Sequence, residues 1–201
     1  MARAGLSRER VLRAALSVVD EEGLSALSMR RLGRELSVEA MSLYRYVRNK
    51  GDLLDGLHET VLAQMRTPEL SGDWLRDAKA VALAFRDALY EHREAIPVFV
   101  TRAAVTPGSL MQLERGLAIL RGAGFPPVMA LSAFQALYTL VVGSVAFHYG
   151  PSASEEEAPD FSALPADTFP NLRGLDLATY DADEELELAI DAMLAGLASR
   201  L

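Results

Sequence analysis

Apolar residues recur every three or four positions along most of this chain, which is the spacing that lines one face of an α-helix. Ser7 precedes the first such stretch as an N-cap, and Gly23 follows it as a stop signal. No stretch between turn signals shows the alternation of a strand, so the chain is predicted to be all-α. The pattern predicts helices at 8–22, 28–36, 38–47, 50–66, 74–93, 109–121, 126–149 and 182–200.

One long stretch, residues 122–154, contains no Asp, Glu, Lys or Arg. A helix over 128–149 is long enough to cross a bilayer, but polar residues such as Gln135 and His148 interrupt it and no basic cluster flanks it. An apolar helix of this kind also occurs buried in a core or a subunit interface. We expect burial, with a membrane-associated helical protein as the alternative. The Pro- and acid-rich residues that follow, with three glutamates at 155–157, predict a long solvated loop.

Charge is distributed unevenly along the chain. The net charge is −8, yet residues 1–50 carry 10 Lys or Arg against 6 Asp or Glu, whereas residues 51–201 carry 10 against 22. A basic head on an acidic body is typical of a protein that meets a polyanion at one end only, although chance clustering gives the same count. We expect a cytoplasmic protein, because the arginine-rich N-terminus lacks the apolar core of a signal peptide.

The sequence offers no convincing catalytic or metal site. The absence of cysteine excludes a disulfide framework, a thiolate zinc site and a cysteine nucleophile. Asp55 and His58 lie three apart on one predicted helix, but a dimetal bundle needs a second such pair. The nucleophile-elbow, phosphate-loop and dinucleotide motifs are absent as well. We therefore predict that the protein is not an enzyme and carries no cofactor, and that His58 is an ordinary packed or surface histidine.

Residues 28–50 join two short amphipathic helices through a three-residue turn, which is the pattern of a helix-turn-helix unit. The second helix is polar on its outer side, and a helix of this kind fits the major groove of DNA with its N-terminal residues at the base edges. A three-helix core decorated with solubilising arginines would give the same pattern. The candidate phosphate contacts around this helix are Arg30, Arg31, Arg34, Arg48 and Lys50.

At these residues the sequence resembles the tetracycline-repressor (TetR) family of bacterial transcriptional repressors. The most specific match is the run LYRYVRNK at 43–50, followed by paired leucines at 53 and 54. Weaker similarities at Trp74, at 84–93 and at 124–125 extend the resemblance to the ligand-binding domain of the tetracycline-binding subgroup. The match therefore covers the first 55 or so residues strongly and most of the chain weakly.

The resemblance implies a set of contacts with double-stranded DNA. The helix that holds Tyr44 would read the major groove, and Arg30 matches an arginine that contacts a guanine. Several reading positions differ from those of the subgroup, so its operator sequence is not expected to carry over. Ser37 stands in the turn where the family usually has glycine. The remaining operator-reading positions are Ala40, Met41, Ser42 and Arg45, and the phosphate-contacting positions are Tyr44, Tyr46 and Lys50.

The resemblance also implies a ligand pocket, but one with different chemistry. Arg66 and Phe99 occupy the positions of the drug- and magnesium-binding histidines, and Val81 that of a drug-binding asparagine, so a tetracycline–magnesium chelate is not expected. We expect a mostly apolar pocket with few hydrogen bonds, although the same residues would also suit a plain core. The candidate pocket residues are Phe85, Phe99, Met111, Gln112, Phe134, Gln135, Leu137 and Tyr138.

These inferences predict a two-part, all-α regulator. Residues 1–50 form the helix-turn-helix domain, and residues 51–201 form the ligand-binding and dimerisation domain, with a long acidic loop at 150–181. Helices 126–149 and 182–200 are expected to build the four-helix interface of a homodimer that binds a near-palindromic operator. A small, largely apolar effector would release this repressor from DNA, with helix 51–66 as the lever. The alternative function is a helical-bundle carrier or enzyme that does not bind DNA.

Overall fold

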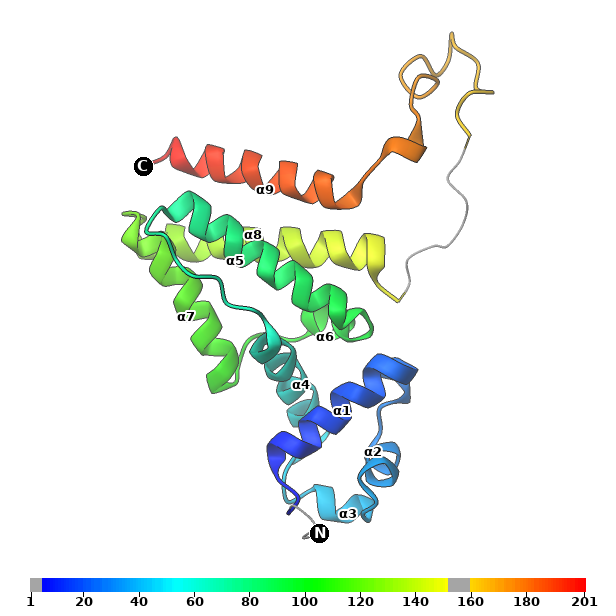
Figure 1. Cartoon of the computed structure of the whole chain (residues 1–201), viewed down its shortest axis with the longest axis vertical. Coiled ribbons are helices and arrows are strands. Elements are labelled where there is room, and N and C mark those ends of the chain that lie inside the picture. Colours follow the sequence, from blue (N-terminus) through cyan, green and yellow to red (C-terminus); the bar gives the residue numbers. More distant parts are fainter. Residues whose placement is uncertain (1–4, 152–159) are drawn as a thin grey trace.

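Nine α-helices and three short 3-10 turns make up the secondary structure of residues 5–151 and 160–201, the residues that the computed structural model describes. No strand occurs in these stretches, which confirms the all-α prediction. The molecule is elongated, with a small head of α1–α3 at one end, a larger body of α5–α9 at the other, and α4 between them (Figure 1). The head therefore meets the rest of the chain largely through one helix.

The head consists of α1 (Arg8–Glu22), α2 (Met29–Leu36) and α3 (Ala40–Leu43). The Ser7 side chain accepts a hydrogen bond from a first-turn amide of α1, and Gly23 ends that helix with φ +81°, so both predicted boundaries are confirmed. The side chains that hold the three helices together are fully buried, and they are Val11, Leu32, Leu43 and Val47.

Helix α3 is shorter than predicted. Its start is delayed because Ser37 adopts the left-handed conformation (φ +54°, ψ +44°) and Glu39 is extended, so that helical geometry begins only at Ala40. Its end comes at Leu43, after which the backbone continues as a turn through Tyr46. Leu43 and Val47 are buried as expected, because two turn hydrogen bonds return the Tyr46 and Val47 amides to the Leu43 carbonyl.

Helix α4 (Lys50–Gln64) begins in the head and ends in the body. Asn49 caps it, because its side-chain oxygen accepts a 2.9 Å hydrogen bond from the Asp52 amide. Gly56 allows α1 to approach closely, since a Cβ atom there would lie only 2.4 Å from the Leu12 side chain. The first half of α4 is thus packed firmly against the head.

The body consists of α5 (Trp74–Glu91), α6 (Ile96–Thr101), α7 (Pro107–Gly122), α8 (Pro127–Tyr149) and α9 (Ala182–Ala198). Helix α8 packs against the other four, and α9 lies along α8 and α5. Lys79 of α5 also binds two carboxylates of α9, at 3.2 Å and 2.8 Å. The last helix is therefore anchored to the body by charge as well as by apolar packing.

Helix α8 is the one described helix that is long and apolar enough to span a membrane. About a third of that window is buried against the other body helices. Its outward side remains uncovered, with Val128 and Phe147 each more than three-quarters exposed. Leu188 of α9 is exposed in the same way. The two helices together leave an apolar face without a partner within this chain.

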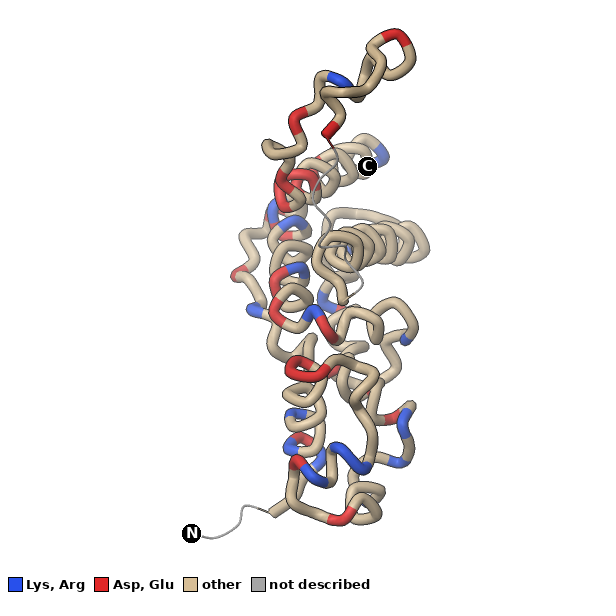
Figure 2. Tube along the Cα trace, turned by 90° about the vertical axis from the view of Figure 1, so that its right-hand side faces the viewer, with Lys and Arg blue, Asp and Glu red and all other residues tan. Residues whose placement is uncertain are grey.

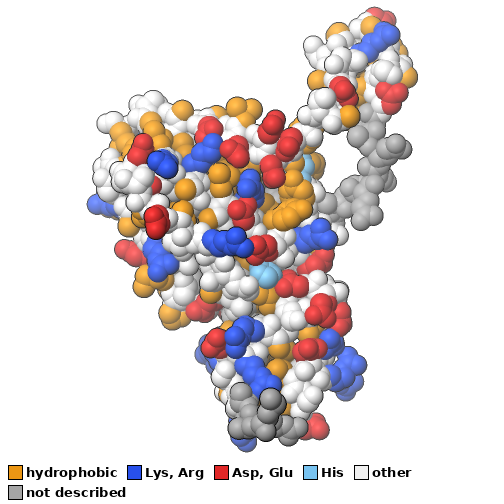
Figure 3. All heavy atoms as spheres, viewed as in Figure 1, with side chains coloured by type: hydrophobic (Ala, Val, Ile, Leu, Met, Phe, Trp, Pro, Cys, Tyr) orange, Lys and Arg blue, Asp and Glu red, His pale blue; other side chains and the backbone are white. Residues whose placement is uncertain are grey.

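Residues 160–180, which precede α9, project from the body (Figure 1). Their base is held by a cluster in which Tyr180 donates a hydrogen bond to Glu185, while His148 lies 3.0 Å from the same carboxylate. Exposed hydrophobic side chains, among them Phe169 and Leu175, lie on the projecting part (Figure 3). The three glutamates at 155–157, predicted to lie in a solvated loop, fall outside the described residues.

Candidate DNA-binding surface and ligand cavity

The residues predicted to meet DNA lie in the head, at the end of the molecule farthest from the body, where basic residues crowd together (Figure 2). Met41 is 76% exposed, which is unusual for a large apolar side chain and suits contact with a base methyl group. The exposed members of the predicted set are Arg30, Met41, Tyr44, Arg45 and Lys50, and the half-buried members are Ala40, Ser42 and Tyr46.

Arg31 has a different role from the one predicted for it. Its guanidinium binds Glu22 at 2.6 Å and Glu35 at 2.9 Å, and only 17% of its side chain is exposed. The pair with Glu22 ties α2 to the end of α1, and the pair with Glu35 lies within α2. The sequence shows the charge of Arg31 but not its two carboxylate partners, which is why it predicts a phosphate contact here. Arg34 and Arg48, by contrast, are exposed as predicted.

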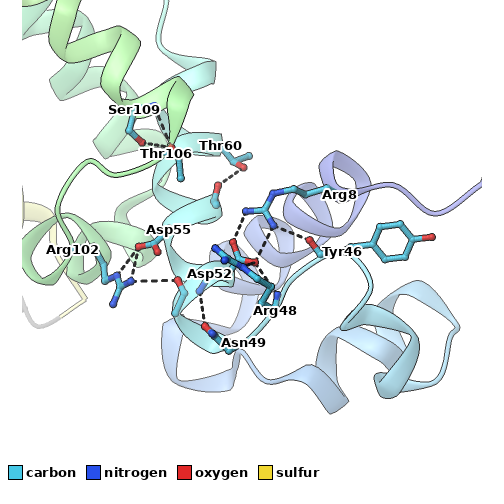
Figure 4. Close-up of polar contacts among 12 residues, drawn as sticks. Arg8, Tyr46, Arg48, Asn49, Asp52, Asp55, Thr60, Arg102, Thr106 and Ser109 are labelled. Atoms are coloured by element: carbon cyan, nitrogen blue, oxygen red, sulfur yellow. Dashed lines mark hydrogen bonds and ion pairs between the residues drawn. The ribbon is translucent and has the colours of Figure 1, made fainter.

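Asp52 connects the head to α4 (Figure 4). Its carboxylate accepts hydrogen bonds from the Arg8 guanidinium at 2.7 Å and from the Arg48 amide at 2.8 Å, and Arg8 also donates to the Tyr46 carbonyl at 2.7 Å. Burial alone would raise the pKa of Asp52, but these hydrogen bonds outweigh it and hold the pKa below its ordinary value. The contacts fix the turn that carries Tyr44 and Tyr46. The sequence analysis gave Arg8 no such role.

Asp55, one turn farther along α4, faces the body instead (Figure 4). Arg102, which follows α6, donates to its Oδ1 through Nε at 2.8 Å and through Nη2 at 2.6 Å. The Asp55 carboxylate is therefore engaged by an arginine rather than paired with His58. Within residues 5–151 and 160–201, no group of three His, Asp or Glu side chains is placed to hold a metal ion.

The body encloses a cavity of about 420 Å³ between α4, α5, α7, α8 and the segment after α6. Its lining is mainly apolar and includes Val81, whereas the exposed Arg66 lies elsewhere. The predicted pocket residues that line it are Phe85, Gln112, Phe134, Gln135, Leu137 and Tyr138.

Two predicted pocket residues are placed differently. Phe99 lies behind the lining, with its ring stacked on that of His58 at 4.4 Å between centroids. Met111 lies on the outer surface of α7 and is 54% exposed. Neighbouring residues of a helix point about 100° apart, so when Gln112 faces the cavity, Met111 turns away from it. The prediction for Met111 rested on its residue type, which suits an apolar pocket, and did not consider which side of the helix it lies on.

Aromatic rings form one wall of the cavity. The rings of Phe85 and Tyr138 are 5.2 Å apart and within 20° of parallel, and those of Phe134 and Tyr138 are 6.4 Å apart and within 25°. Gly116 makes room for this wall, since a Cβ atom there would lie 2.4 Å from the Phe134 ring. The result is an apolar aromatic wall against which an aromatic ligand can pack.

His58, for which the sequence predicts no function, also lines the cavity, next to the aromatic wall. It is almost fully buried, with Nδ1 3.1 Å from the Ser109 hydroxyl and Nε2 3.5 Å from the Tyr138 hydroxyl. Burial lowers its pKa, against the opposing charge of Asp55 and Glu59, so the ring is neutral near pH 7. Its position in the sequence could have indicated that it faces inward, because it follows Leu54 by four residues and therefore lies on the same, inner side of α4.

Comparison with known proteins gives family matches over most of the chain. Residues 11–57 match the family described as bacterial regulatory proteins, tetR family. Residues 67–201 match the family described as tetracyclin repressor-like, C-terminal domain. The first match covers the helix-turn-helix unit, and the second covers α5–α9 together with the loop between α8 and α9.

Individual relatives agree over nearly the whole length. The tetracycline repressor protein class G of Vibrio anguillarum is 31% identical over 196 residues, which are 95% of this chain and 93% of that protein. The structure of the Streptomyces coelicolor protein ActR in complex with actinorhodin superposes with a TM-score of 0.87 at 30% identity, covering 98% of this chain and 97% of that one. TetR from Acinetobacter baumannii superposes with a TM-score of 0.69 at 30% identity, covering 97% and 98%.

Proposed function

This chain belongs to the TetR family of bacterial transcriptional regulators, and from that premise we propose that it is a homodimeric repressor released from its operator by a small ligand. In this proposal residues 1–50 bind DNA and residues 51–201 bind the ligand and the second subunit, in the cytoplasm. The observation that carries it is the path of α4, which runs from the exposed recognition surface to an internal cavity.

The proposed DNA contacts divide into two kinds. Arg30, Ala40, Met41, Ser42 and Arg45 are assigned to base edges in the major groove, since they lie at or near α3 and most of them are exposed. Tyr44, Tyr46 and Lys50 are assigned to phosphates, which position the helix without reading sequence. Lys50 lies at the N-terminus of α4, where the helix dipole adds to its attraction for a phosphate.

The uncovered face of α8 and α9 is the proposed dimer interface. Burial of such a face against a second copy removes its apolar surface from water, at roughly 25 cal/mol per Å². A two-fold axis through this interface would place the two heads on the same side, so that they meet two half-sites of a near-palindromic operator. The exposed positions that would pack are Val128, Leu131, Thr139 and Phe147 of α8 and Leu188, Ala192 and Ala195 of α9.

Helix α4 is the proposed lever between ligand and DNA. Its successive turns carry Asp52 bound to the head, Asp55 bound to the body and His58 in the cavity wall. A ligand that binds better when α4 is displaced would shift the population of the dimer towards head spacings that do not fit the operator. The mainly apolar lining supports a largely apolar effector. ActR, a relative of the same fold, binds actinorhodin in its solved complex.

The experiment that tests this function is fluorescence anisotropy with duplexes that cover the DNA upstream of the gene and of its divergent neighbour. We expect tight binding to one duplex, weak binding to a scrambled duplex, and a steep loss of affinity as salt rises. The complex that forms is then screened for ligands that dissociate it. Equally weak binding to every duplex, followed by a random-sequence selection that enriches nothing, would contradict the proposal and leave a helical small-molecule carrier.

A further inference from the structure

The charges around the cavity are strongly one-sided. Arg102 is the one formally charged residue among the described residues that line it, and no carboxylate is among them. His58 is neutral near pH 7, and the other polar groups are hydroxyls and amides. Asp55, which pairs with Arg102, is not among the lining residues, so the charged group nearest a bound ligand is a guanidinium, which suits an anion better than a cation.

Arg102 also reaches out of the cavity to α4. It follows the last turn of α6, where its amide donates to the Val98 carbonyl at 2.9 Å, and its Nε and Nη2 both bind Oδ1 of Asp55. The same Nη2 lies 3.5 Å from the Gly51 carbonyl in the first turn of α4. Arg102 thus lines the ligand cavity as a residue, while its guanidinium binds the helix that begins beside the DNA-contacting turn (Figure 4).

We propose that the effector is a planar aromatic molecule with an anionic group, and that this group binds Arg102 in competition with Asp55. The proposal rests on the proposed function, because it names the ligand class and the trigger of the same cavity. The aromatic wall of Phe85, Phe134 and Tyr138 takes the ring system. The planar fork of the guanidinium takes a carboxylate, sulfonate or phenolate through paired hydrogen bonds.

Competition for Arg102 explains how occupancy reaches the head. Asp55 is only 18% exposed, so it depends on Arg102 for its stabilisation in the ligand-free protein. When the anion takes this partner, α4 loses its ion pair with the body but keeps the pair between Asp52 and Arg8 in the head. The head and α4 then have one tie fewer to the body, which favours their movement together relative to it.

The test uses two fluorescent probes that share one ring system and differ in charge. These are 8-anilinonaphthalene-1-sulfonate, which is anionic, and N-phenyl-1-naphthylamine, which is neutral. We expect the wild-type protein to bind the sulfonate at least ten-fold more tightly than the amine, since a hydrogen-bonded charge pair is worth about that factor. In Arg102→Gln the ratio of the sulfonate affinity to the amine affinity should fall about ten-fold. The affinity for the amine should stay unchanged, which also shows that the variant is folded.

Two further variants sharpen the result. Arg66→Gln removes an arginine that is almost fully exposed and outside the cavity, and it should leave the ratio of the two affinities unchanged. Asp55→Asn keeps Arg102 but removes the carboxylate that competes with the anion for it. This variant should therefore bind the sulfonate a few-fold more tightly, and the operator more weakly, than wild type. Only the sulfonate should dissociate the wild-type operator complex.

The outcomes separate this inference from the proposed function. If Arg102→Gln and Arg66→Gln keep the same probe ratio as wild type, or if Asp55→Asn weakens sulfonate binding, the anion site is wrong even though the protein binds its operator. If no duplex is bound in the absence of probe, the proposed function is wrong, whatever the probe ratio shows. Release of the operator by the neutral amine at equal occupancy would overturn the role of Arg102 as trigger.

Discussion

Ser37 is the one residue other than glycine, among those the structure describes, with a left-handed backbone. A side chain costs roughly 1–2 kcal/mol in this conformation, although glycine also makes the unfolded chain more flexible. We therefore expect Ser37→Gly to raise the free energy of unfolding by about 0.5–1 kcal/mol, measured by urea titration. Ser37→Val, with its branched Cβ, should lower it. Equal stability of the three proteins would show that the strain is relieved in solution.

Tyr44 is exposed on the turn after α3, and its hydroxyl is assigned to a phosphate. Tyr44→Ala should reduce operator affinity at least ten-fold in an anisotropy titration, while the far-UV circular dichroism and the dimer stay unchanged. Tyr90→Ala removes an equally exposed tyrosine from the body and serves as the matched control. Tight operator binding by Tyr44→Ala would show that the recognition helix has been misassigned.

His58 makes the stability of the body depend on pH. Its pKa in the folded protein lies below the ordinary 6.5, chiefly because burial disfavours the charged ring. Above pH 6.5 the ring is neutral in both states, whereas below it the unfolded chain binds a proton first, so stability falls as the pH drops towards the folded pKa. We expect a loss of up to about 1 kcal/mol per pH unit in urea titrations. His58→Asn should flatten this slope, and an unchanged slope would assign it to another group.

Individual side-chain roles were predictable where they depend on local sequence. The cap Ser7 is predictable, because capping involves residues three positions apart. Arg31 was misassigned and Arg102 was missed because each depends on a carboxylate that tertiary folding brings close. Pairings of this kind leave no periodic signal in a single sequence. Their discovery needed the structure.

At the scale of elements, the crossing of α2 and α3 depends on Gly33. A Cβ atom there would lie 2.9 Å from the Val38 carbonyl oxygen and 3.2 Å from the Ala40 amide nitrogen, and backbone atoms cannot turn aside as a side chain can. Gly33→Ala should therefore separate the two helices and cost about 1–3 kcal/mol, with loss of operator binding. The measurements are urea titration and anisotropy on the specific duplex.

Gly122→Ala is the matched control for that variant. Gly122 ends α7, and a Cβ atom there would meet nothing within 4 Å. We expect its stability and operator affinity to equal those of wild type within about 0.5 kcal/mol. If Gly33→Ala behaves in the same way as this control, the helix-turn-helix packing is looser than its distances indicate.

Most elements could be read from the sequence, because helical periodicity and turn residues are local signals. The exceptions arise where short segments follow tertiary constraints. Helix α3 is shorter than predicted at its start because of the backbone conformations of Ser37 and Glu39 and at its end because of the turn after Leu43, and α6 was not predicted as a helix. The cavity was predicted as a mostly apolar site, but its depth and its single charge emerge only from the arrangement of five segments.

At the scale of the whole molecule, the uncovered face of α8 and α9 predicts a dimer that a single charge would break. Leu188→Glu places a carboxylate in the centre of this face, where Leu188 is 71% exposed in the single chain. We expect light scattering after size-exclusion chromatography to show a monomer, with loss of operator affinity. Leu70→Glu alters an equally accessible leucine outside this face and should remain dimeric. A dimeric Leu188→Glu protein would place the interface elsewhere.

The uneven charge of the molecule also bears on how quickly it finds its target. A genome offers millions of wrong sites, and time spent bound to them delays arrival at the right one. Here the first 50 residues, with 10 basic against 6 acidic residues, attract DNA, while the rest, with 10 against 22, repels it. Only an approach with the head leading is favoured, so chance encounters with chromosomal DNA should be brief. The acidic body should thereby reduce the time that the protein spends bound to non-target DNA, and so shorten the search for the operator.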